Sequence, residues 1–348
     1  MNELTDKQLE RLEKQIAKEY KASEKLVRKQ LEKHVNEFEA RNQQRLRLVA
    51  RGRITEDEYA EWYEKELESG YWVRHAVEDA AREQTKANER AIALVGIALI
   101  GILVDGLNYG AYEVEKAARR DTKYAPPNKT FIERLIKDNP QLRPKVNIPK
   151  DRLWNERAIR RELIVGMKQG EGPRKVAKRF QSVGMRPYTA RDIKNAHLKT
   201  AKQISREVAK KNYNVAVRNA RSMINSAHNY GKWESYKRAE KLGLKVVKVW
   251  SATMDDRTRD SHAFLDGVSV KVNEEFPNGL MYPCDPGGSA DEYWNCRCEL
   301  SMDVEGYERD WSDLSQRNTD HFIDDSYDDW KERHGAFDVI DGKWQKVL

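Results

Sequence analysis

The sequence has 348 residues, of which 39% are apolar and 35% are charged, and its formal net charge is +7. This length suits one large domain or two to three ordinary ones, and the high charged fraction favours long solvated helices over a thick globule. The opening residues contain no apolar stretch of the kind found in a secretory signal, and an odd count of three cysteines argues against a disulfide framework.

The charge is distributed unevenly along the chain. Residues 1–90 carry 19 basic and 20 acidic side chains, residues 91–250 carry 35 and 14, and residues 251–348 carry 10 and 23. The central basic block is an electrostatic signature of polyanion binding, and solvated helix faces are the plain alternative. The acidic C-terminal third is a candidate for docking onto the basic block, within or between subunits.

The first fifty residues predict one long helix. Apolar residues recur at spacings of three, four or seven from Leu9 to Phe38, so we expect this stripe to be buried on another helix or on a partner chain. A capping box of Thr55 and Glu58 then begins a shorter helix, which Gly70 ends.

A further helix is expected from about Tyr71 into the run Ala91–Val104, which has fourteen residues and no charge. Fourteen is fewer than the roughly 18–20 residues that span a bilayer, so we expect a helix buried by neighbouring helices or subunits. A membrane-active segment, released in a later event, is the alternative.

Basic connectors rich in proline flank a short helix near 130–138, and helices resume at 151–168 and 173–182. The helix expected over 189–213 begins at a capping box of Thr189 and Asp192, and it has an apolar face. The opposite arc is almost purely cationic and consists of Arg191, Lys194, Lys199, Lys202, Arg206 and Lys210. No base-reading motif accompanies it, so it predicts contacts to DNA phosphates that do not depend on base sequence. A separate helix is expected over 214–242.

From Gly243 onward, short β-branched runs and turn residues predict a small α+β module of about sixty residues. The last forty residues are acidic and aromatic, and Asp341-Gly342 predicts a terminal hairpin. The predicted fold class is therefore α+β, with mostly α-helical N-terminal and middle regions and a small α+β C-terminal module.

The stretch from Arg218 to Leu300 resembles the phage head morphogenesis domain of the Mu F-like minor head proteins. The resemblance covers about residues 160–303, and it rests on an ordered set of residues: Arg218, Arg221, Trp250, Asp256, Arg257, Thr258, Arg259, His262, Asp266, Gly267, Pro283, Asp285, Pro286, Asn295, Cys296, Arg297 and Cys298. The sequence departs from the family pattern at Cys284, where glycine is expected.

The resemblance implies a low-copy structural protein of a tailed phage, without a cofactor-dependent reaction. Its implied partners are the portal protein, the packaged double-stranded DNA, and other copies of itself or capsid proteins. Its implied location is the virion, in the head interior or neck, after assembly in the host cytoplasm, with roles in head assembly and genome delivery. A membrane-active ejection protein built around residues 91–104 is the alternative.

We therefore predict three segments along the chain. Residues 1–150 form a helical region for portal or subunit contacts. Residues 151–305 form the head morphogenesis domain, in which basic helices precede the small α+β module. Residues 306–348 form an acidic, aromatic C-terminal tail.

All three cysteines lie within fifteen positions, which favours a common site. Cys296 and Cys298 are one residue apart, so a strand would place both thiols on one face. Together with His262 and Cys284 they form a usual ligand set for a structural Zn²⁺, and we predict that the four converge. Their spacing differs from that of the best known zinc modules. Two alternatives are buried thiols beside a hydrogen-bonded histidine, or a disulfide.

A hydrolytic enzyme is the least favoured interpretation. His262 together with Asp255, Asp256 and Asp266 resembles a hydrolytic cluster, and a cysteine–histidine nucleophile pair is a second arrangement of that kind. Nothing in the sequence marks a low-pKa thiol or an oxyanion hole, so we predict no enzymatic activity and no catalytic residues.

Overall fold

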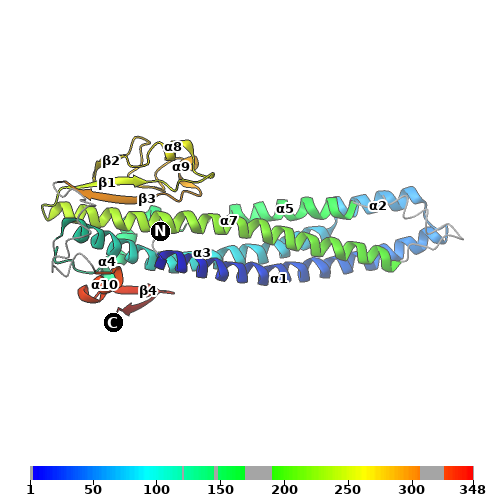
Figure 1. Ribbon diagram of the computed structural model, residues 1–348. Helices are drawn as coiled ribbons and strands as arrows, with labels where there is room; N and C mark the ends of the chain where they lie inside the picture. Colours follow the sequence, from blue (N-terminus) through cyan, green and yellow to red (C-terminus); the bar gives the residue numbers. More distant parts are fainter. Residues whose placement is uncertain (1–2, 120, 145–147, 169–189, 306–324, 348) are drawn as a thin grey trace. The chain divides into compact units, whose positions relative to one another are not determined.

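The computed structural model describes residues 3–119, 121–144, 148–168, 190–305 and 325–347. Within these residues the chain is mostly helical with two small antiparallel sheets, which confirms the predicted α+β class (Figure 1). The helices are α1 (Glu3–Ala50), α2 (Glu56–Ser69), α3 (Tyr71–Ala118), α4 (Lys129–Asp138), the 3-10 helix η1 (Pro140–Leu142), α5 (Ile148–Lys168), α7 (Ala190–Lys241), α8 (Asp260–Ala263), α9 (Ala290–Tyr293) and α10 (Tyr327–His334). The strands are β1 (Val246–Ser251), β2 (Ser269–Lys271), β3 (Glu299–Val304), β4 (Phe337–Ile340) and β5 (Lys343–Lys346).

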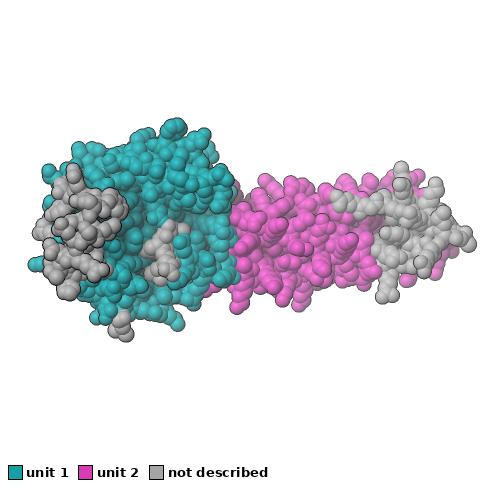
Figure 2. All heavy atoms as spheres, in the orientation of Figure 1, with its two compact units in different colours: residues 1–14, 93–145, 217–348 teal, residues 15–92, 146–216 magenta. Residues whose placement is uncertain are grey.

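The chain divides into two compact units, which Figure 2 colours separately. Unit 1 comprises residues 1–14, 93–145 and 217–348, and unit 2 comprises residues 15–92 and 146–216. Helices α1, α3 and α7 each contribute residues to both units. The two units do not coincide with the predicted segments 1–150, 151–305 and 306–348. Those segments assign roles along the chain, and the assignment stays a prediction.

Unit 2 has a core made by the apolar stripe of α1. Leu31 and Val35 are fully buried in it, among apolar side chains of α2, α3, α5 and α7. This confirms that the stripe of the first helix is covered by other helices. The predicted capping box is also present, because the Thr55 hydroxyl accepts from the Glu58 amide and the Glu58 carboxylate accepts from the Thr55 amide.

In unit 1, the apolar part of α3 lies in a core that it shares with α7 and the three-stranded sheet. Leu103, Val104 and Leu107 are fully buried there. The helices approach closely at glycines, since a Cβ atom on Gly106 would lie 2.4 Å from the His228 carbonyl oxygen. By length and composition, the helical stretch Glu56–Ala118 is apolar enough to cross a membrane. Of its most apolar segment of 18 residues, 61% is buried within the protein. That burial favours the expected core helix.

The three-stranded sheet of unit 1 has the order β2-β1-β3, with both pairs antiparallel. It lies along the C-terminal part of α7 (Figure 1). Alternate residues of β1 face the core, so Val246, Lys248 and Trp250 are buried. Trp250 lies opposite Leu300 of β3, and this pairing brings the strand that follows the cysteines next to β1.

Helix α7 is a single helix of 52 residues, so the expected division into helices over 189–213 and 214–242 is wrong. The residues around the expected division include neither glycine nor proline, and therefore nothing stops helix propagation there. The expected helix over 173–182 and the capping residue Thr189 lie outside the described residues.

The end of the chain packs within unit 1. Strands β4 and β5 form the predicted hairpin, whose two-residue turn is Asp341-Gly342 with both φ angles positive. The Trp330 indole of α10 donates to the Glu115 carboxylate of α3 at 2.7 Å. The hairpin is held by Asn108, whose amide donates to the Phe337 carbonyl at 3.3 Å.

Candidate functional site

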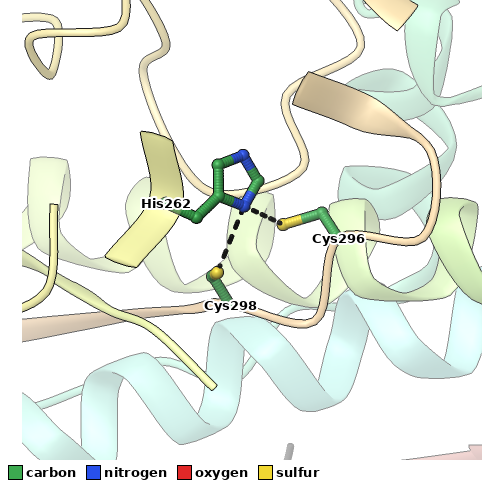
Figure 3. Close-up of side chains that lie close together, drawn as sticks. All are labelled: His262, Cys296 and Cys298. Atoms are coloured by element: carbon green, nitrogen blue, oxygen red, sulfur yellow. Dashed lines mark hydrogen bonds between the residues drawn. The ribbon is translucent and has the colours of Figure 1, made fainter. Parts of the chain in front are cut away.

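His262 and two cysteines form a buried cluster in unit 1. The histidine lies on α8, and its Nδ1 atom is 3.4 Å from the Cys298 sulfur and 3.8 Å from the Cys296 sulfur (Figure 3). The three ligand atoms all lie within 4.8 Å of one another, and all three residues are buried. The cluster therefore brings together three of the four residues that were predicted as metal ligands.

The backbone before the cysteines turns sharply, which lets both sulfurs point to the same histidine nitrogen. Asn295 has a φ of 59°, a left-handed conformation that asparagine tolerates better than most residues. Its amide donates to the Ser222 hydroxyl of α7 at 2.9 Å. Cys296 follows this turn, and Cys298 immediately precedes β3.

A buried polar face of α7 fixes the cysteine segment. The Asn225 side chain donates to the carbonyls of Cys296 at 3.0 Å and Cys298 at 3.1 Å. One helical turn later, Asn229 donates to the Cys298 and Pro283 carbonyls and accepts from the Leu300 amide. These side chains satisfy the backbone of a segment that belongs to no strand, and they position both thiols.

The other ring nitrogen of His262 faces a carboxylate. Nε2 lies 2.8 Å from Glu292 of α9, and Glu292 also accepts from Asn278 at 3.0 Å and Ser261 at 3.1 Å. Sequence reasoning missed Glu292, Asn225 and Asn229. Residues that hold a metal-ligating side chain in place need no fixed distance from it in the sequence. A single sequence therefore contains no motif that marks them.

Cys284 lies beside this cluster but outside the group of three. Its buried thiol is within hydrogen-bond reach of the Ser222 carbonyl at 3.2 Å and the Tyr293 carbonyl at 3.3 Å, and it also interacts with Cys296. The φ of Cys284 is 64°, a conformation that favours glycine. A glycine, which the resemblance led us to expect at this position, would adopt this φ without steric cost.

The electrostatics of the cluster disfavour free thiolates. Hydrogen bonding to Cys284, together with burial, raises the pKa of Cys296 to about 12. Hydrogen bonding to Cys296 and burial likewise raise the pKa of Cys298. Burial acts to lower the pKa of His262, but hydrogen bonds with Cys298 and Glu292 outweigh it and leave that pKa raised. These raised pKa values favour the protonated, weakly nucleophilic form of both thiols.

The geometry fits a metal centre better than a catalytic pair. Zinc bond lengths in a tetrahedral site imply about 3.6 Å between nitrogen and sulfur ligands, close to both separations found here. A cysteine nucleophile needs access for its substrate and an activated thiolate. Cys296 and Cys298 are only 3% and 2% exposed, and both of their pKa values are raised. The donor set, two soft thiols and an imidazole, suits Zn²⁺.

Two of the three aspartates considered for a hydrolytic cluster, Asp255 and Asp266, have other partners. Asp255 forms a bidentate ion pair with Arg297, and hydrogen bonding from Arg297 lowers the pKa of Asp255. Asp266 accepts from the Ala252 amide at 2.8 Å. Among the described residues, the carboxylate that contacts His262 is that of Glu292.

Helix α7 also carries the predicted cationic arc, in the part that belongs to unit 2. Its exposed members are Lys194, Lys199, Lys202, Arg206 and Lys210. On the opposite side, Ala201, Ile204 and Val208 are buried in the unit 2 core. Arg191 lies in the first turn of α7, and its side chain is outside the described residues. Among the described residues, no carboxylate forms an ion pair with any of the five exposed cations.

A second group of potential metal ligands consists of Glu115, Asp121 and His334. The Glu115 carboxylate of this group already accepts hydrogen bonds from Trp330, His334 and Thr122. Asp121 is exposed. This group therefore serves to dock the C-terminal segment onto α3.

Comparison with known proteins gives one family match. The family described as Phage Mu protein F like protein matches residues 157–301. The NAD(+)--arginine ADP-ribosyltransferase EFV of Enterococcus faecalis (strain ATCC 700802 / V583) is 33% identical over 127 residues, which are 36% of this chain and 26% of that protein. The Minor head protein GP7 of Bacillus phage SPP1 is 26% identical over 210 residues, which are 58% of this chain and 59% of that protein. The chain thus spans about a quarter and about three fifths of these two curated relatives. No solved structure matches the chain.

Proposed function

We propose that the chain is a structural minor head protein of a tailed phage, because the family model described as Phage Mu protein F like protein matches residues 157–301. The observation that carries this proposal is that the similarity to the minor head protein of phage SPP1 extends over 58% of the chain. The match to the ADP-ribosyltransferase covers only 26% of that protein, so its activity is not transferred to this chain. The proposal assigns no catalytic residue.

Within the head, the proposed partners are the portal protein, the packaged DNA, and other copies or capsid proteins. The proposed location is the head interior or neck, reached by assembly in the host cytoplasm, and the roles are head assembly and genome delivery. Co-expression of the full chain with the portal protein of the same phage tests the first partner. Co-purification through size exclusion supports the proposal, whereas separate elution of the two proteins counts against it.

The membrane-active alternative is less well supported, because 61% of the most apolar 18-residue window is buried and Leu103 and Val104 lie in the core of unit 1. Liposome flotation of the full chain tests this alternative. We expect the chain to stay at the bottom of the gradient. Flotation with neutral vesicles would favour the ejection hypothesis instead.

The exposed cations of α7 are proposed to contact DNA phosphates. Four of them, Lys199, Lys202, Arg206 and Lys210, lie on one side of the helix with no described carboxylate paired to them. Phosphate contacts release condensed counterions, so the binding constant should fall steeply with salt. Since no base-reading motif is present, binding should be weak and indifferent to base sequence.

The test reverses these four residues to glutamate in the full chain. We expect low-salt binding to duplex DNA to weaken and the slope of log K against log salt to shrink by roughly 3–4. The control reverses four exposed lysines of unit 1, namely Lys245, Lys271, Lys343 and Lys346, which changes net charge equally. Equal loss of DNA affinity in the α7 variant and in the control would reject the cationic arc as the DNA-contact surface. No loss of affinity in the α7 variant would reject it as well.

The cluster of His262, Cys296 and Cys298 is proposed to hold one structural Zn²⁺, with Cys284 as the fourth ligand after a rotation of its side chain. Two observations support Cys284 as the fourth ligand. Its side chain interacts with Cys296, and it is buried beside the cluster. A closed site of one imidazole and three thiolates leaves no position for a substrate, so the ion acts as a staple. A module of short strands and turns gains stability from such a staple.

Metal analysis of the full chain tests the staple. We expect about one zinc per chain, lost in Cys296→Ser together with part of the thermal stability of unit 1. Removal of zinc by a chelator should lower the stability of the wild type but leave that of Cys296→Ser unchanged. Wild-type protein that contains no zinc and gains no stability from added zinc would refute the proposal.

A further inference from the structure

Glu292 holds His262 from the side opposite the cysteines. Its carboxylate lies 2.8 Å from Nε2 of His262. Figure 3 shows Nδ1 of the same ring facing both sulfurs. The carboxylate itself is fixed by the Asn278 amide at 3.0 Å and the Ser261 hydroxyl at 3.1 Å. The four side chains Ser261, His262, Asn278 and Glu292 therefore form a connected network around one imidazole.

This network decides which ring nitrogen carries the proton. An ionised carboxylate only accepts hydrogen bonds, so the Nε2 atom beside it must be the donor. In a neutral imidazole the other nitrogen then has a free lone pair. That nitrogen is Nδ1, which points toward the Cys296 and Cys298 sulfurs. The histidine is thus oriented, and its tautomer selected, for binding a cation between itself and the thiols.

We propose that Glu292 is the positioning residue of a metal centre at His262, Cys296 and Cys298, and that it raises the affinity of the centre for Zn²⁺ by fixing the ring and its tautomer. This inference rests on the zinc site proposed above. Carboxylates behind a metal-bound histidine typically change metal affinity 10–100-fold. Glu292 touches no ion itself and acts only through His262.

Glu292 also joins α8 to α9, so a purely structural role predicts a different pattern. Such a role would lower the stability of the metal-free protein and leave the affinity of the folded site for metal unchanged. The positioning role predicts weaker metal affinity in a protein that is still folded. Metal affinity and metal-free stability must therefore be measured separately on the same variants.

The experiment titrates the full metal-free chain with Co²⁺, whose absorption reports thiolate ligands, and then displaces Co²⁺ with Zn²⁺. The variants are Glu292→Gln and Glu292→Ala, and the matched control is Asp291→Asn, an exposed carboxylate on the same short helix. We expect a 10–100-fold loss of affinity in both Glu292 variants, larger for alanine, and none in the control. At saturation the sulfur-to-cobalt absorption should match that of the wild type, because the thiolate ligands are unchanged.

The outcomes separate this inference from the proposed zinc site. If the wild type binds Co²⁺ and Zn²⁺ and both Glu292 variants bind equally tightly, Glu292 is not a positioning residue and the zinc site stands. If the wild type binds neither ion, both proposals are rejected. Should Glu292→Ala fail to fold by circular dichroism, Glu292→Gln decides, because its side chain has the same shape and loses only the charge.

Discussion

At the scale of single residues, Cys284 carries a backbone conformation that glycine would adopt more easily. A left-handed φ of 64° costs a cysteine about 1–2 kcal/mol relative to glycine. The proposed role of the Cys284 thiol as the fourth zinc ligand offsets this cost. The residue therefore offers a substitution that removes the sulfur without distorting the backbone.

We predict that Cys284→Gly folds and binds Co²⁺ more weakly, with lower sulfur-to-cobalt absorption because one thiolate is lost. The backbone gain offsets part of the lost packing, so metal-free stability should change little. Visible absorption at saturating Co²⁺ is the measurement. An unchanged spectrum and affinity would remove Cys284 from the ligand set and leave a three-residue site.

The pKa of Glu115 predicts how the stability of the protein changes at acid pH. Burial raises its pKa, but hydrogen bonds from His334, Thr122 and Trp330 outweigh this and lower the pKa from its ordinary value of 4.5 to about 2. A lowered carboxyl pKa means that the unfolded chain takes up the proton first. The stabilisation, on the order of 3 kcal/mol, is therefore present above about pH 4.5 and is lost as the pH falls toward 2.

Urea unfolding of the wild type and Glu115→Gln between pH 7 and pH 3 measures this effect. We expect the wild type to be more stable at pH 7, and the difference in unfolding free energy to shrink below about pH 4.5. A difference that stays constant over the whole range would show that the charge of Glu115 does not hold the C-terminal segment.

The residues of the site were only partly predictable. His262, Cys296 and Cys298 were found because their residue types are rare and have metal-binding chemistry. The structure brings these three together and leaves the Cys284 sulfur turned toward backbone carbonyls. Glu292 was missed, since it is one of many acidic residues and its contact with His262 depends on how α8 and α9 meet.

At the scale of elements, the close packing of α3 on α7 within unit 1 explains the apolar run better than membrane insertion does. A Cβ atom on Gly231 of α7 would lie 2.8 Å from the Leu107 amide nitrogen, and one on Gly110 would lie 2.8 Å from the Lys232 Cα. Together with Gly106, these glycines let the two backbones approach closely. Gly96, on the same helix α3, has only an ordinary contact at 3.5 Å with Pro144.

We predict opposite effects for two glycine-to-alanine substitutions in α3. Gly106→Ala should destabilise unit 1 by about 1–3 kcal/mol or more, because backbone atoms cannot move aside. Gly96→Ala should be neutral or stabilising by up to about 1 kcal/mol, because alanine favours the helix. Thermal unfolding followed by tryptophan fluorescence compares them. Equal effects would mean that α3 and α7 are not packed in this way.

Local signals explain which elements were predictable. The apolar stripe of α1, the capping box at Thr55 and the Asp341-Gly342 turn each depend on residues near one another in the chain, and all three are present. The predicted division of α7 is wrong, because Ala190–Lys241 is one continuous helix. A helix ends where the backbone is stopped, and no residue around position 213 does so.

At the scale of the whole molecule, the two compact units depend on contacts between distant segments. Unit 1 joins the first residues, the middle of the chain and its end, and unit 2 joins residues 15–92 to 146–216. The change in charge near residue 90 and the predicted boundary at 150 lie close to the unit boundaries at 92/93 and 145/146, but no change in charge or composition marks those at 14/15 and 216/217. The helical class was predictable from periodicity, whereas the pairing of helices depends on side-chain packing over long sequence separations.

Under the proposed function, this chain is a structural component of a phage head. The test is quantitative mass spectrometry of purified, DNA-filled heads and separately purified tails of the phage whose genome carries this sequence. We predict that the chain is present in the heads, in far fewer copies than the major capsid protein, and that it stays bound after washing in high salt. Its absence from the heads, with the protein found only in the infected-cell lysate, would contradict the claim.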